Sequence, residues 1–214
     1  PSSGRRLAYA RYLTSGRHPL VARVLVNRFW MLHFGKGLVS TTGEFGKLGT
    51  TPSNPELLDW LADEFMSKGW SLKHLHRKIM TSTVYRQQAR RTPEADSVDN
   101  SNQLYSHFPV HRLEAETIRD SILAVSGRLD TTQFGRAVDV SADTAGQVVI
   151  TGESQRRSIY VQVRRTQPVA ILKSFDAPDM EVNCTDRTHS TAATQSLMLM
   201  NSKFILEFSE AFAE

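Results

Sequence analysis

The stretch from Pro19 to Phe34, PLVARVLVNRFWMLHF, constrains this chain more than any other. Proline stands at the favoured first position of a helix and Gly35 follows as a terminator, so the sequence predicts one helix here. Apolar side chains occur on almost every side of that helix, which is typical of a helix at the centre of a core. A central position requires that Arg23, Asn27 and Arg28 find polar partners or reach the surface.

A glycine-rich loop and three more helices are predicted downstream. Residues 35–49 contain five glycines, which is typical of a loop with positive φ angles or close backbone approaches. Asn54 and Pro55 predict the N-cap and first residue of a helix with an apolar stripe at Leu57, Leu58, Leu61 and Phe65. Further helices are predicted at about residues 71–86 and 112–126.

The periodicity changes between about residues 136 and 165. Residues 147–151 resemble a short strand, and in 157–165 Ile159, Val161 and Val163 alternate with polar side chains as in a half-buried strand. Helical patterns return at about 192–200 and 203–213. The predicted fold class is therefore mainly α, with a small antiparallel β-hairpin or sheet inserted at about 136–165.

Length and charge bear on the domain organisation. With 214 residues, the chain can form one domain or two small ones. Residues 1–91 hold 15 Lys and Arg against 5 Asp and Glu, whereas residues 92–214 hold 11 against 17. The polar segment 90–102 predicts a linker. We expect a single mainly helical domain over 1–214, with two possible sub-lobes, a basic one at 1–91 and a second at 103–214. The opposite charges of the two parts favour their packing against each other.

Several classes of protein are disfavoured by what the sequence contains. With Cys184 as its single cysteine, the chain can form neither an internal disulfide nor a zinc ribbon nor a C-x-x-C-H haem site. No apolar run approaches the roughly 18 residues of a membrane span. Polyanion or nucleic-acid binding by the basic half stays an alternative, but no known nucleic-acid motif accompanies the charge, so no nucleic-acid partner is expected. The missing initiator Met and the final amphipathic stretch suggest a fragment of a longer protein.

The predicted helix at 112–126 carries a candidate catalytic site. Arg112, Glu116 and Asp120 are spaced i, i+4, i+8, and Arg119 shares their stripe. Paired carboxylates suit general acid/base hydrolysis if their pKa values differ, but an ion-pair ladder along the helix explains the same spacing. A specific version of this structural interpretation pairs Glu116 or Asp120 with Arg23 or Arg28 of the apolar helix.

Other candidate sites are weaker. His33 lies at the C-terminal end of the apolar helix, where the helix dipole favours the imidazolium form, and H-E-x-x-H is not found. Among the tryptophans, Trp30 and Trp60 are predicted to be core residues and Trp70 is the candidate for ligand stacking. The loop 176–186 departs from the EF-hand pattern, so we expect no metal site and only weak candidates for calcium ligands. These are Asp176, Asp179, Glu181 and Asp186.

Three long segments, taken together, resemble a known family. The motif ARVxVNRxWxxxFGxGLV matches residues 22–39, and HPELLDWLA matches with Asn54 in place of the usual His. The segments FPVHRLEAETIRDSILAVSGRLD and RRSIYVQVRRTQPVAILKSFDAPDMEVNCTDRTHSTAATQSLMLMNSKF follow in the same order. In these features the chain resembles a family of planctomycete-type C-terminal domains of unknown function. Such domains occur in large exported proteins that often contain a cytochrome-c-like region.

This resemblance implies context more than chemistry. It implies a periplasmic or cell-surface protein whose partners are other domains of the same polypeptide. We expect no cofactor in this piece, and any haem would belong to neighbouring domains. The leading interpretation is a non-catalytic binding or scaffold module, with a polysaccharide or a redox protein as its partner. The alternative is a hydrolytic domain whose candidate catalytic site joins three residues of the apolar helix to four of the helix at 112–126, namely Arg23, Asn27, Arg28, Arg112, Glu116, Arg119 and Asp120.

Overall fold

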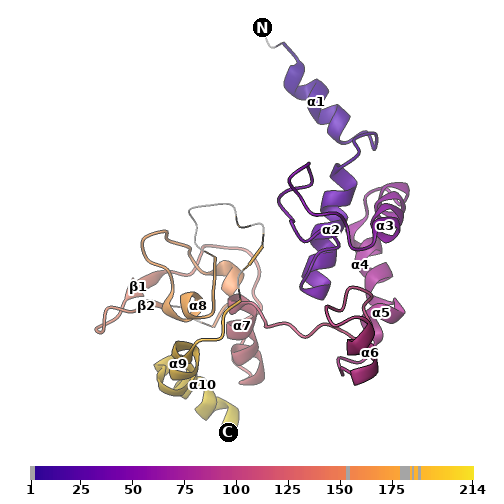
Figure 1. The fold of residues 1–214 in the computed structure, drawn as a ribbon. Coiled ribbons are helices and arrows are strands. Elements are labelled where there is room, and N and C mark those ends of the chain that lie inside the picture. The colour runs from indigo at the N-terminus through magenta and orange to yellow at the C-terminus, as the bar shows by residue number, and fades with distance from the viewer. Residues whose placement is uncertain (1–2, 153–154, 179–183, 185, 188) are drawn as a thin grey trace. The chain divides into compact units, whose positions relative to one another are not determined.

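The computed structural model describes residues 3–152, 155–178, 184, 186–187 and 189–214 (Figure 1). It divides into two compact units, Pro1–His111 and Arg112–Glu214. Each unit has its own hydrophobic core. The described helices include none that is long and apolar enough to cross a membrane.

The described part of the first unit consists of helices joined by loops and contains no strand. Its elements are α1 (Arg5–Leu13), α2 (Val21–Phe34), α3 (Pro55–Ser67), α4 (Leu72–Met80), α5 (Thr83–Arg86) and α6 (Pro93–Val98). The predicted caps are confirmed, since the Asn54 side chain accepts a hydrogen bond from Leu57 N and the Ser71 side chain accepts one from His74 N. Gly35 ends α2 with a φ of 76°, as its position predicts.

Helix α2 is the centre of this unit, as predicted, and packs along α3 (Figure 1). The core consists of Val26, Trp30, Phe34, Leu38, Val39, Leu58, Leu61, Phe65, Leu75 and Ile79. The prediction that Trp60 belongs to the core is wrong, because its side chain is 51% exposed and lies beside the ammonium of Lys78. Trp60 follows the buried Leu58 by two positions, which turns it away from the face that α3 buries.

The second unit combines helices with one small sheet. Its elements are α7 (Ala115–Val125), β1 (Val140–Ala142), β2 (Val148–Ile150), the 3₁₀ helix η1 (Ser158–Tyr160), α8 (Ala170–Ser174), α9 (Ala193–Asn201) and α10 (Lys203–Ala213). β1 and β2 pair antiparallel, with Val140 opposite Ile150. Both α8 and α10 pack against α7. The predicted fold class, mainly helical with one small antiparallel sheet, is confirmed.

The predicted strand at 157–165 is wrong. Residues 158–160 form η1, and Ile159 and Val163 are 75% and 67% exposed. The backbone N–H and hydroxyl of Ser158 both donate to Asp120, so a side chain of α7 binds the backbone where a strand would begin. Val161 is buried and forms a single parallel bridge with Val138.

The segment 90–102, predicted as a linker, contains α6 and belongs to the first unit. Thr92 caps α6 through its side chain. After the helix, the carboxylate of Asp99 accepts hydrogen bonds from the backbone N–H groups of Gln103 and Leu104. The boundary between the two units follows His111.

Candidate functional site

The candidate catalytic residues of α7 are held within the second unit. Arg119 is 0% exposed and donates to the carbonyl of Arg156 at 2.9 Å and to Ser158 Oγ at 3.1 Å. Its guanidinium also lies 3.5 Å from Asp120 Oδ1. Burial lowers the pKa of Arg119, and the charge of Asp120 opposes this. Arg119 therefore binds η1 to α7.

The two carboxylates of α7 have partners distant in sequence. Asp120 Oδ1 accepts from the N–H and the hydroxyl of Ser158, both at 2.7 Å, and Arg157 lies 3.5 Å from Asp120 Oδ2. Glu116 accepts from Arg187 at 2.7 Å. These bonds use the carboxylates to join α7 to later segments of the same unit, a structural role.

Arg112 and Asp176 bind a common residue. Arg112 donates to the Ser190 carbonyl and to the Gln195 side chain. Asp176 accepts from Ser190 N at 2.6 Å and from Ser190 Oγ at 2.9 Å, and these bonds lower the pKa of Asp176. Both residues therefore fix the segment that precedes α9.

The structure gives no support for a metal site in the part of the chain that it describes. Asp179 and Glu181 lie outside the described residues. The backbone carbonyl of Asp186 accepts from Cys184 Sγ at 3.0 Å. No group of three or more His, Cys, Asp or Glu among the described residues could hold a metal ion.

The polar residues of α2 have partners inside the first unit. Arg23 donates to Asp59 Oδ1 at 2.6 Å, and this bond raises the pKa of Arg23 and lowers that of Asp59. The acidic partner of Arg23 is thus Asp59 of α3, and not Glu116 or Asp120 of α7 as the hypothesis proposed. Arg28 is exposed.

His33 and Trp70 have local contacts. His33 Nε2 lies 2.8 Å from His76 Nδ1, and burial, with a smaller effect of His76, lowers the pKa of His33. Burial therefore acts against the imidazolium form that the helix dipole favours. Trp70 is half-buried, with its ring 5.3 Å from that of Phe65, which leaves Trp60 as the more exposed ring.

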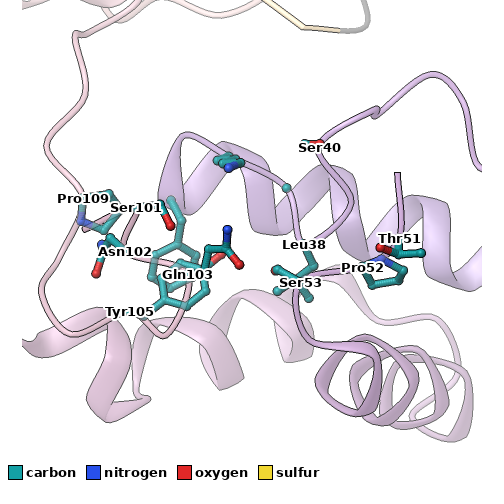
Figure 2. A pocket seen from close by; sticks show the side chains of 13 residues that line it. Leu38, Ser40, Thr51, Pro52, Ser53, Ser101, Asn102, Gln103, Tyr105 and Pro109 are labelled. Carbon is teal, nitrogen blue, oxygen red and sulfur yellow. The ribbon is translucent and has the colours of Figure 1, made fainter. Parts of the chain in front are cut away.

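An open pocket of about 390 Å³ lies in the first unit. It is lined by Phe34, Lys36, Gly37, Leu38, Ser40, Thr51, Pro52, Ser53, Ser101, Asn102, Gln103, Tyr105 and Pro109. Figure 2 shows Ser101, Asn102, Tyr105 and Pro109 on one side, Leu38 and residues 51–53 on the other, and Gln103 between them. We call the two walls the 36–53 loop and the 99–109 loop.

The 36–53 loop is fixed by a buried amide. The side chain of Asn27, 1% exposed, donates to Val39 O at 3.0 Å and accepts from Val39 N at 2.8 Å. A Cβ atom on Gly37 would lie 2.7 Å from the Asn27 side chain, so glycine is required for this approach. Asn27 therefore acts as a structural anchor.

The 99–109 loop is fixed by a carboxylate and an aromatic residue. Asp99 is 8% exposed, and its hydrogen bonds from the loop, chiefly from Leu104 N, lower its pKa. Tyr105 has a φ of 54°, an unusual value for an aromatic residue, and its hydroxyl accepts from Trp30 Nε1 at 2.7 Å. Strained residues of this kind often occur where a loop is shaped for a ligand.

The polar groups that face this pocket include several without an internal partner. Within the described part of the chain, no hydrogen bond or ion pair is formed by the side chains of Lys36, Thr51, Ser53 and Gln103. Sequence reasoning missed this site, because the lining residues of its two loops are at least 48 residues apart and neither loop contains a known motif. The five glycines of 35–49 were the one available signal.

Comparison with known proteins places the chain in a family. Neither a curated protein nor a solved structure matches it. A family model described as protein of unknown function (DUF1553), PSD1, matches residues 5–214. The match covers nearly the whole chain, and the chain therefore belongs to the PSD1 (DUF1553) family.

Proposed function

We propose that this chain is a non-catalytic binding module whose first unit binds a hydroxyl-rich ligand, the exposed part of an oligosaccharide or polysaccharide. The observation that carries the proposal is that the side chains of Thr51, Ser53 and Gln103, which are exposed and form no hydrogen bond within the described part of the chain, line one open pocket. Such groups both donate and accept, as sugar hydroxyls do. A volume of about 390 Å³ also lies within the usual range of about 300–1,000 Å³ for small-molecule sites.

The α7 residues favour a binding module over the hydrolytic alternative. General acid/base catalysis needs a carboxylate that can reach a substrate. Asp120 and Glu116 instead accept hydrogen bonds from Ser158 and Arg187 of their own unit. On the family resemblance, we also propose an exported location, periplasmic or at the cell surface, beside other domains of the same polypeptide.

Isothermal titration calorimetry of the whole chain with neutral and acidic oligosaccharides tests the binding function. Gln103→Ala removes one pocket amide, and losing one such hydrogen bond, about 0.5–1.5 kcal/mol, should weaken binding roughly 2- to 12-fold. The control is Gln133→Ala, which alters an exposed glutamine of the second unit and should leave binding unchanged. Equal losses in both variants, or no binding of any sugar by the wild type, would refute the proposal.

A further inference from the structure

We propose that the pocket selects acidic sugars, with Lys36 binding a carboxylate or sulfate group while Thr51, Ser53 and Gln103 bind neighbouring hydroxyls. This inference rests on the proposed binding function and specifies its ligand. Carboxylate and sulfate share the chemistry that Lys36 can recognise, namely an anionic group of oxygen acceptors.

The charge of the lining supports an anionic ligand. Lys36 is the single charged side chain among the thirteen residues that line the pocket. It is exposed, and within the described part of the chain no carboxylate forms an ion pair with it. The ammonium therefore keeps its three donors for solvent or a ligand.

The charge of the whole unit acts in the same direction. Residues 1–111 contain 15 Lys and Arg against 8 Asp and Glu, a net charge of +7. A field of this sign raises the local concentration of anions and speeds their association. Asp99, the acidic residue of the 99–109 loop, accepts hydrogen bonds from Gln103 N, Leu104 N and Ser101 Oγ, so its carboxylate is already bound by its own loop.

The lining places Lys36 and the neutral polar side chains around the same pocket. Lys36 lies on the 36–53 loop just after α2, and Thr51 and Ser53 lie at the other end of the same loop. Gln103 stands between this wall and the opposite one (Figure 2). A ligand in the pocket can therefore contact the Lys36 ammonium and the neutral polar groups together. A neutral sugar would contact the neutral groups but has no anionic group for Lys36.

The test compares three probes by calorimetry on the whole chain: trigalacturonic acid, its neutral methyl ester and galactose 6-sulfate. We expect trigalacturonic acid, galactose 6-sulfate or both to bind at least tenfold more tightly than the methyl ester. The two acidic probes separate a carboxylate from a sulfate as the recognised group. Raising the salt concentration should weaken the binding of the acidic probes and leave the binding of the ester unchanged.

Variants at two lysines of the same loop test the assignment to Lys36. Lys36→Met should remove the preference for acidic probes, Lys36→Arg should retain most of it, and Lys47→Met, which alters an exposed lysine outside the lining, should not change it. Equal affinity for the ester and the acids would overturn this inference but leave the binding function standing. An equal effect of Lys47→Met and Lys36→Met would also overturn it, and no binding of any probe would overturn both proposals.

Discussion

Replacing Asn27 by leucine tests the role of the buried amide directly. The variant keeps a side chain of similar size but removes both hydrogen bonds to Val39, which is 2% exposed. The N–H and C=O of Val39 would then be buried without partners, at about 1–3 kcal/mol each. Burying leucine offsets about 2 kcal/mol of this. We expect the free energy of unfolding of the first unit to fall by about 2 kcal/mol, and at most by about 4 kcal/mol.

Tryptophan fluorescence during urea unfolding measures this change. The chain has three tryptophans, Trp30, Trp60 and Trp70, and all lie in the first unit, so the signal reports that unit. The midpoint should move to lower urea with little change in slope, as expected when stability changes and the folded state does not.

The neighbouring residue provides the control for Asn27→Leu. Arg28 is exposed on the same helix, and Arg28→Ala should change the free energy of unfolding by no more than about 0.5 kcal/mol. If Asn27→Leu has an effect as small as that of Arg28→Ala, the amide does not hold the 36–53 loop and the reasoning fails.

Three further predictions concern other contacts. Gly37→Ala should destabilise the first unit by about 1–3 kcal/mol, because the new Cβ would meet the fixed Asn27 side chain. Gly46→Ala should destabilise it less, because there the Cβ would meet the movable end of the Glu44 side chain. Urea midpoints of the two variants measure the difference. Burial lowers the pKa of His33 on folding, so the unfolded chain binds more protons than the folded chain. The urea midpoint should therefore fall as the pH drops through about 6.5, and His33→Gln should reduce this dependence. A midpoint that rises on acidification would contradict the assignment. Arg119→Met should destabilise the second unit by about 3–5 kcal/mol, because Asp120 and the Arg156 carbonyl lose a buried partner. Hydrogen exchange of the α7 amides should become faster. Unchanged exchange would show that the buried guanidinium is dispensable.

Helices could be predicted from the sequence where local signals determine them. Asn54 and Ser71 bind N–H groups three residues away, and the apolar stripe of α3 lies within one helix, so both can be read from short windows. The central position of α2 follows from the apolar side chains around it.

The errors and omissions depend on contacts between distant segments. Ser158 is turned into η1 by Asp120, 38 residues earlier, and no alternating pattern in 157–165 can reveal this. The pocket requires the 36–53 and 99–109 loops to meet, and the partners of Glu116 and Arg112 are Arg187 and Ser190, more than 70 residues away. The candidate α7 residues could thus be identified as important from their type, while their role required the folded structure.

Both walls of the pocket are anchored to one face of α2, where Asn27 binds Val39 and Trp30 binds Tyr105 three residues further along the helix. The groups that face the ligand, Lys36, Gln103 and the two hydroxyls, take no part in this anchoring. Ligand preference can therefore change by substitution at the lining while the helix keeps the walls in place. Members of one family with this framework could then serve chemically different ligands, and an engineer could alter specificity without first stabilising the protein.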